Sequence, residues 1–126
     1  STWALQLAKA AGLRAIVASS SAAKRAQAET LGADATIDYV AEPAWDARVR
    51  ELTAGVGADL VLDVGGAGTM QRSIAATRVG GTVAVVGGLG GGFASEVDGA
   101  ALMGGLPEKR GSPGPREVLA RQKQPR

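Results

Sequence analysis

The sequence predicts an α/β protein built around a parallel sheet. Apolar runs with the length of buried strands alternate with segments of helical periodicity, and glycine or serine clusters follow the runs. The runs are continuously apolar rather than alternating, as a sheet covered by helices on both faces requires. Short links between the elements imply right-handed crossovers, and therefore parallel strands.

The first part of the chain predicts two helices separated by a strand. Four residues share the i, i+3, i+4, i+7 spacing of one helical face: Ala4, Leu7, Ala8 and Ala11. Gly12 stands where a left-handed helix end is expected, and residues 13–18 form a short apolar run typical of a buried strand. The serines at 19–21 suit the N-terminus of a helix over residues 22–31, which Gly32 ends.

The same alternation continues to Gly88. Strands are predicted over residues 35–39, 60–64 and 82–86. One helix is predicted from Pro43 to Leu52, and another along the face formed by Met70, Ser73, Ile74 and Thr77. Glycines punctuate these segments at Gly55, at Gly65, Gly66 and Gly68, and at Gly80 and Gly81.

Positive charge is concentrated at the C-terminal end. The whole chain has a net charge of +2, but residues 1–106 carry −2 and residues 107–126 carry +4. The latter also hold four of the five prolines and no apolar periodicity, so we expect residues 105–126 to be an irregular, basic tail after a domain over residues 1–104. Because the body is slightly acidic and only 3% of residues are aromatic, we expect no nucleic-acid partner.

Two absent residue types limit the chemistry of this chain. It contains no cysteine and no histidine, which excludes disulfides, thiolate nucleophiles and Ser-His-Asp catalysis. A zinc site would have to be built from carboxylates alone, which zinc sites seldom are, so we expect no zinc to be bound here. No signal peptide or membrane-length apolar run is found, so we expect a cytoplasmic protein without a membrane partner.

Two stretches, Leu5–Tyr39 and Gly57–Gly88, carry a resemblance to a known family in the order, spacing and strand-end chemistry of their elements. Through them, residues 1–104 are similar to the coenzyme domain of the medium-chain dehydrogenase/reductase family, which includes zinc-dependent alcohol dehydrogenases and zinc-free quinone and enoyl reductases. The resemblance implies a partial doubly wound (Rossmann) parallel sheet. The first strand of that sheet and the glycine-rich loop that meets the cofactor pyrophosphate are not present in this sequence.

The first strand of such a sheet lies at its centre. We therefore expect two half-sheets with unpaired inner edges, and a chain that is marginally stable or aggregation-prone on its own. Residues 107–126 also depart from the family pattern, which would continue with another strand and helix. A frameshift or an artificial end near Pro107 would explain this departure.

The resemblance implies a nicotinamide-cofactor site at the end of the strand predicted over residues 13–18. NAD-binding proteins carry an acidic residue there, whereas this chain has Ser19 and Ser20, followed by Lys24 and Arg25. Hydroxyl groups and cations suit a 2′-phosphate, and Tyr39 matches a tyrosine that contacts this phosphate in NADPH-using relatives. These residues favour NADP(H) over NAD(H). The alternative is that the serines cap a helix and the two cations form a solvated face.

Six further candidates follow two later strands: Asp63, Val64, Gly65, Val86, Gly87 and Gly88. Small residues at these strand ends would let the ribose and nicotinamide approach the backbone, although a plain strand-to-helix turn is the alternative. Asp34 and Asp38 are interpreted as turn and strand-end residues, and Trp45 as a packing residue. No residue is predicted to be a catalytic acid or base.

The resemblance implies an oxidoreductase coenzyme domain that binds NADP(H) for hydride transfer to or from a carbonyl, alcohol or activated alkene. The small-molecule substrate would bind through a catalytic domain outside this segment, the longer parent could be a homo-oligomer, and we expect this segment alone to be inactive. The alternatives are a non-catalytic nucleotide-binding remnant or interaction module, and a methyltransferase-like domain. The Tyr-x-x-x-Lys pair of short-chain dehydrogenases is absent, because Pro43 stands four residues after Tyr39.

Overall fold

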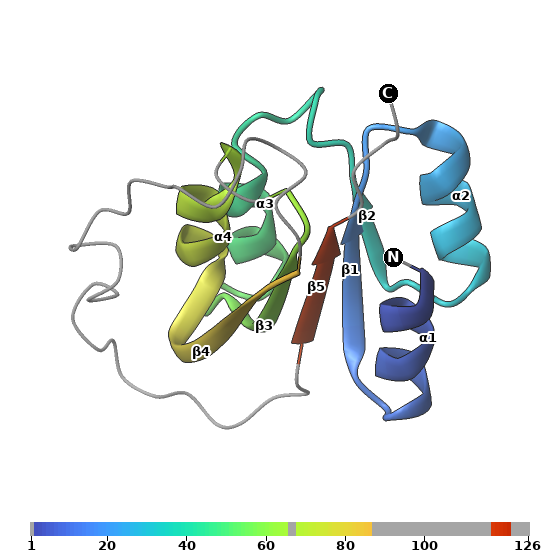
Figure 1. Ribbon diagram of the computed structural model, residues 1–126, viewed down its shortest axis with the longest axis horizontal. Helices are drawn as coiled ribbons and strands as arrows, with labels where there is room; N and C mark the ends of the chain where they lie inside the picture. Colours follow the sequence, from blue (N-terminus) through green and yellow to red (C-terminus); the bar gives the residue numbers. More distant parts are fainter. Residues whose placement is uncertain (1, 66–67, 87–116, 122–126) are drawn as a thin grey trace.

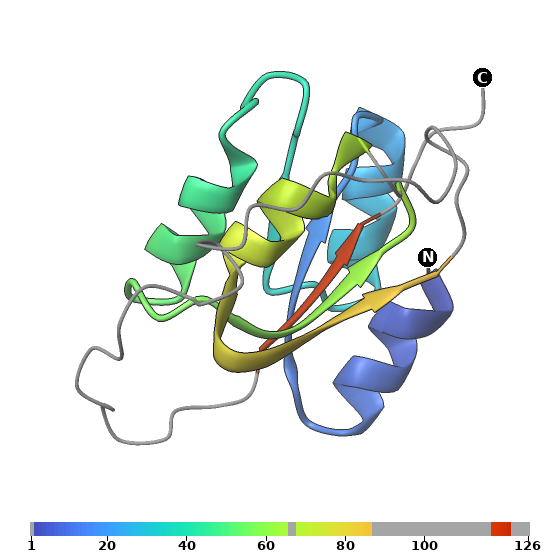
Figure 2. The same ribbon diagram turned by 60° about the vertical axis from the view of Figure 1, so that its left-hand side comes forward.

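The computed structural model describes residues 2–65, 68–86 and 117–121. Within these ranges five parallel strands form one sheet in the order β2-β1-β5-β3-β4. The elements in chain order are α1 (Thr2–Ala10), β1 (Arg14–Ala18), α2 (Ala22–Thr30), β2 (Ala35–Ile37), α3 (Trp45–Leu52), β3 (Ala58–Asp63), α4 (Met70–Ala76), β4 (Thr77–Val85) and β5 (Glu117–Arg121). Helices α1 and α2 cover one face of the sheet, and α3 and α4 cover the other (Figures 1 and 2). The predicted parallel α/β fold is therefore confirmed.

Strand β1 shows why its apolar run is continuous. Ala15 and Val17 belong to the core cluster beneath α1 and α2, whereas Ile16 and Ala18 belong to the cluster beneath α3 and α4. All four side chains are at most 3% exposed. Because successive strand residues point to opposite faces, a strand that is covered on both faces must be apolar at every position.

The predicted helix ends agree with the backbone geometry. Gly12, Gly32 and Gly55 follow α1, α2 and α3 with φ values of 74°, 99° and 82°, which place each in the left-handed region. Ser21 is the N-cap of α2, and its Oγ accepts a hydrogen bond from the Lys24 N–H. In the ranges that the structure covers, no helix has the length and apolarity needed to cross a membrane.

The predicted start of the fourth strand is wrong. Strand β4 begins at Thr77 rather than at residue 82, so Gly80 and Gly81 lie inside it. The pairing of β3 with β4 shifts register in this region, and Gly80 has a φ of 78°. A Cβ on Gly81 would lie 2.6 Å from the Thr77 methyl group and 3.0 Å from the Asp59 carbonyl oxygen. The glycine pair therefore permits a strand irregularity, and does not mark a break between elements.

The largest correction concerns residues 117–121, which lie in the segment predicted to be an irregular tail. They form β5 at the centre of the sheet, between β1 and β3 (Figure 1). The expectation of two half-sheets with unpaired inner edges is therefore wrong, because the backbones of both edges pair with β5. The other residues of 105–126 lie outside the described ranges, and the domain limits remain predictions.

Candidate cofactor-binding site

The carboxyl ends of the parallel strands meet at one edge of the sheet, where ligands bind in doubly wound folds. At this edge the Tyr39 hydroxyl donates a hydrogen bond of 3.4 Å to Oγ of Ser20. Ser20 follows β1 and Tyr39 follows β2, so the parallel pairing of these two strands brings the two hydroxyls together. Both side chains are partly exposed. Two of the predicted cofactor-binding residues therefore share one place on the surface.

The serines beside Ser20 have internal partners. Ser19 is fully buried, and its Oγ accepts a hydrogen bond from the Ser21 N–H at 3.2 Å. The Ser21 hydroxyl caps α2. Ser19 therefore shapes the turn from β1 into α2. Ser20 and Ser21 are partly exposed, but the Ser21 hydroxyl caps the helix, so Ser20 is the serine of these three that is best placed to contact a ligand.

The two cations of α2 have different surroundings. One guanidinium nitrogen of Arg25 donates a hydrogen bond of 2.8 Å to the Ser19 carbonyl oxygen, and it lies 3.3 Å from Oδ2 of Asp38. Within the described part of the chain, the Lys24 ammonium has no hydrogen-bonding or ion-pair partner. Lys24 therefore carries a charge that an external anion could neutralise, whereas Arg25 is already partly neutralised.

Asp38 follows β2 and forms the turn that leads to Tyr39. Its Oδ1 accepts hydrogen bonds from the backbone N–H groups of Val40 and Ala41. The hydrogen bond from Ala41 is the main reason that the pKa of Asp38 is lowered, and the bond from Val40 and the charge of Arg25 act in the same direction. A charged carboxylate thus lies beside Arg25 at the place where an NADP site would need positive charge. The interpretation of Asp38 as a turn residue did not include this contact.

Asp63 is a buried anchor at the end of β3. Its carboxylate is fully buried and accepts hydrogen bonds from the Gly65 N–H and from the hydroxyls of Thr69 and Ser73. These three donors replace the water that a carboxylate would otherwise require. The Asp63 side chain is therefore satisfied inside the protein, where it links the end of β3 to Gly65 and to the start of α4.

The remaining predicted site residues lie at the ends of β3 and β4. Val64 is partly exposed, Gly65 is buried, and Val86 is exposed at 43%. The Val86 N–H donates a hydrogen bond of 2.8 Å to the Asp63 carbonyl oxygen, so the ends of the two strands lie side by side. Gly87 and Gly88 lie outside the described residues.

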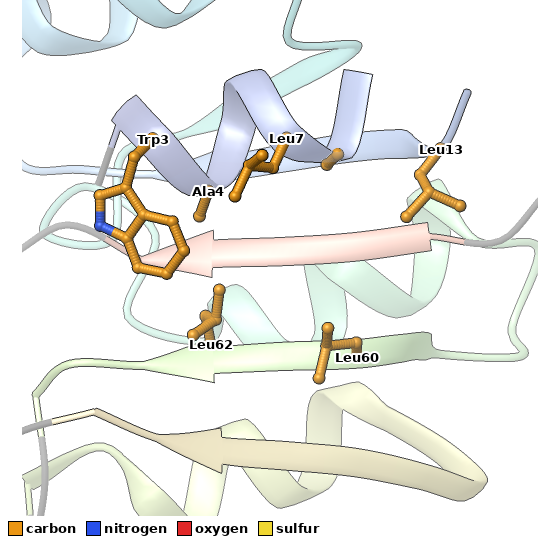
Figure 3. Close-up of a pocket in the computed structure, with 7 residues that line it drawn as sticks. Trp3, Ala4, Leu7, Leu13, Leu60 and Leu62 are labelled. Carbon is orange, nitrogen blue, oxygen red and sulfur yellow. The ribbon is translucent and has the colours of Figure 1, made fainter. Parts of the chain in front are cut away.

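An apolar groove of about 230 Å³ lies between α1 and β3. Its lining residues are Trp3, Ala4, Leu7, Ala8, Leu13, Leu60 and Leu62 (Figure 3). The indole N–H of Trp3 is the one polar side-chain group among them, and none of them belongs to the Ser20–Tyr39 cluster. The groove therefore lacks the donors and charges that a phosphate needs, and the polar strand ends are the better candidate for a nucleotide site.

Comparison with known proteins identifies the family. A family model described as zinc-binding dehydrogenase matches residues 1–112. The chain belongs to the zinc-binding dehydrogenase family. A zinc-type alcohol dehydrogenase-like protein of Schizosaccharomyces pombe is 42% identical over 87 residues, which are 69% of this chain and 25% of that protein. The predicted membership of the medium-chain dehydrogenases/reductases is confirmed.

Solved structures of this family share the fold. A quinone oxidoreductase of Pseudomonas syringae matches 94% of this chain and 33% of its own length, with a TM-score of 0.71 and 33% identity. Mycobacterial Rv1454c complexed with NADPH matches 94% and 34%, with a TM-score of 0.70 and 35% identity. An NAD-dependent alcohol dehydrogenase matches 95% and 32%, with a TM-score of 0.69 and 32% identity. The chain thus spans about a third of these dehydrogenases and reductases.

Zinc is part of the family description, but this zinc-binding dehydrogenase chain has no histidine and no cysteine. In the ranges that the structure describes, no group of three or more acidic residues is placed to hold a metal ion. These residues therefore do not fit a zinc site.

Sequence reasoning missed two partners of the predicted site residue Asp63. Thr69 stands at the N-cap position of α4, but its hydroxyl donates to Asp63 instead of capping the helix. Ser73 lies one turn further along α4 and also donates to Asp63. An acidic residue at a strand end, followed by hydroxyl residues four apart at the start of a helix, is the signal that could have identified this network.

Proposed function

We propose that this chain is the NADP(H)-binding part of an oxidoreductase that transfers hydride to or from a carbonyl, alcohol or activated alkene. The longer protein would bind its small-molecule substrate through a separate catalytic domain and act in the cytoplasm. When bound, the nicotinamide supplies the hydride chemistry, and the residues described above would position the cofactor. The chain spans only a quarter to a third of the length of its relatives, so we propose the activity, substrate and partners for the longer protein and not for this segment alone.

The observation that carries the NADP(H) preference is the set of groups after β1. Ser20 and Tyr39 present two hydroxyls within 3.4 Å of each other, and Lys24 lies in the first turn of the helix that follows. No acidic residue occupies positions 19–21, where NAD-binding proteins place a carboxylate for the ribose 2′-hydroxyl. Hydroxyl donors with an ammonium group that has no partner in the described chain favour a phosphate dianion over a neutral ribose.

The contact between Arg25 and Asp38 opposes this preference. The Asp38 carboxylate neutralises part of the guanidinium charge and would repel a nearby phosphate. The Ser19 carbonyl oxygen also holds the Arg25 guanidinium, so the guanidinium would keep one contact if Asp38 lost its charge. We infer that Lys24 is the main cation for the 2′-phosphate, and that Arg25 contributes less.

The proposal is tested by titrating the chain with adenosine 2′,5′-bisphosphate and with adenosine 5′-monophosphate in a calorimeter. These probes differ in the 2′-phosphate alone and do not require the pyrophosphate loop. We expect the bisphosphate to bind at least about tenfold more tightly, since one charge-assisted hydrogen bond is worth about that factor. Equal affinities for the two probes would contradict the NADP(H) preference.

Three variants assign the effect to residues. Lys24→Gln should reduce bisphosphate affinity about tenfold and leave monophosphate affinity unchanged. Arg48→Gln removes a positive charge from α3, on the other face of the sheet, and should change neither affinity. Asp38→Asn should strengthen bisphosphate binding, because the carboxylate beside Arg25 is removed. An equal loss in the Lys24 and Arg48 variants would mean that only the total charge matters.

A further inference from the structure

The centre of the sheet is occupied by the strand that comes last in the sequence. All five residues of β5 pair with β1, and three of them also pair with β3, in parallel on both sides. In the doubly wound order 3-2-1-4-5, the first strand lies between the second and the fourth. Here β1 and β3 take the places of the second and fourth strands, so β5 lies where that order puts the first.

One residue of β5 packs in the core between the two neighbouring strands. Leu119 lies opposite Ile16 of β1 and opposite Val61 of β3, in the same row across the sheet. All three side chains have 0% exposure and belong to the cluster beneath α3 and α4. A strand in this position must therefore supply an apolar residue at this row as well as backbone hydrogen bonds on both edges.

On the other face of the sheet, the apolar groove lies between α1 and β3, the neighbour of β5. Figure 3 shows β5 running between these elements, with Leu7 on the α1 side and Leu60 and Leu62 on the β3 side. Strands β1 to β4 follow one another within residues 14–85, where helices and strands alternate. Residues 86–116 separate β4 from β5 along the chain. The place of β5 is therefore set by its pairing with β1 and β3, and not by a short link to β4.

We propose that the space between β1 and β3 is a strand-binding site, and that residues 117–121 occupy it as an exchangeable segment. The site selects an extended peptide that enters parallel to both neighbours and carries leucine opposite Ile16 and Val61. A separate peptide with the sequence of this C-terminal segment can replace it, as in recognition by added β-strands, where backbone hydrogen bonds supply affinity and side-chain pockets supply specificity.

The test uses the full chain with a protease recognition sequence inserted between Gly104 and Gly105. After folding, the chain is cleaved and passed over a size-exclusion column under native conditions. We expect the C-terminal piece to elute with the rest of the chain. Release of this piece would overturn the proposal, whether the remainder stays folded or aggregates.

Exchange is measured by unfolding the cleaved protein in urea and diluting it with an excess of a fluorescent peptide of residues 113–126. The labelled peptide should elute with the refolded protein, and a peptide with Leu119→Asp should be incorporated at least about tenfold less well. A peptide with Gln124→Asp carries the same charge change outside β5 and should behave like the original. Failure of the original peptide to enter, or equal entry of the Leu119→Asp peptide, would overturn the proposal.

Discussion

The hydroxyl of Ser73 donates a hydrogen bond of 2.6 Å to the carboxylate of Asp63, and both side chains are fully buried. The Thr69 hydroxyl and the Gly65 N–H donate to the same carboxylate. This single acidic residue therefore connects β3, the turn that follows it and α4. The turn that would approach a cofactor is held from inside the protein.

Replacing Asp63 with alanine tests this network. Asp63→Ala leaves one N–H and two hydroxyls without their acceptor, so we expect the free energy of unfolding to fall by about 3 kcal/mol or more. Asp59→Ala is the matched control, because it removes a partly exposed carboxylate paired with Arg78 and should cost about 1 kcal/mol or less. Urea unfolding of the two variants gives the comparison. Equal losses would show that the buried network stabilises the chain no more than the partly exposed ion pair does.

Among the glycines whose surroundings the structure describes, Gly57 should be the least tolerant of a side chain, because it combines a positive φ with close backbone contacts. Its φ is 98°, and a Cβ there would lie 2.7 Å from the backbone nitrogen of Arg78. We expect Gly57→Ala to destabilise the chain through both backbone strain and this close contact, by roughly 2–4 kcal/mol. Gly55→Ala serves as the control, because its φ of 82° carries the strain while no atom lies within 4 Å of the added Cβ. The difference in melting temperature between the two variants measures the effect of the close contact with Arg78. Similar melting temperatures for the two variants would show that this contact adds nothing to the backbone strain.

Leu119 should be essential if β5 belongs to the core. Leu119→Asp buries a charge between Ile16 and Val61, so we expect loss of cooperative unfolding, or a destabilisation of more than about 3 kcal/mol. Val40→Asp makes the same kind of change at a side chain that is 66% exposed, and should have little effect. Circular dichroism melts of both variants provide the measurement. Two unchanged melts would mean that the chain folds without β5.

The stability contributed by Asp34 should depend on pH. Burial raises the pKa of Asp34, but hydrogen bonds from Lys9 and the Ala15 N–H, with the charges of Lys9 and Arg14, outweigh it, so the pKa lies below its ordinary value of 3.8. A lowered folded-state pKa stabilises the protein above the unfolded value, and this contribution is lost as the pH falls through the folded value.

The pH dependence is measured by comparing the original chain with Asp34→Asn. The asparagine keeps an oxygen that can accept from Ala15 but loses the charge that attracts Lys9. The difference in unfolding free energy should be constant from neutral pH to about pH 5, and should shrink as the pH falls below 3.8. A difference that does not change with pH would contradict the ionic contribution.

Some of the fold and site could be predicted from local patterns. The continuous apolar run of β1 required cover on both faces, and Gly12 and Ser21 marked helix ends through their backbone preferences. The family followed from the order and spacing of such elements, and residues 1–112 match its model. The pairing of Ser20 with Tyr39 was also accessible, because neighbouring parallel strands end at the same edge.

The sequence alone determined the helices, the first four strands apart from the start of β4, and the edge where a nucleotide would bind, because these depend on local propensity and periodicity. Only the tertiary structure decided that residues 117–121 form the central strand. Its apolar run is only three residues long and stands between charged residues after two prolines, and its pairing depends on the edges of β1 and β3, which are distant in sequence. The buried network of Asp63 and the contact between Arg25 and Asp38 were hidden for the same reason, since side-chain partners depend on packing.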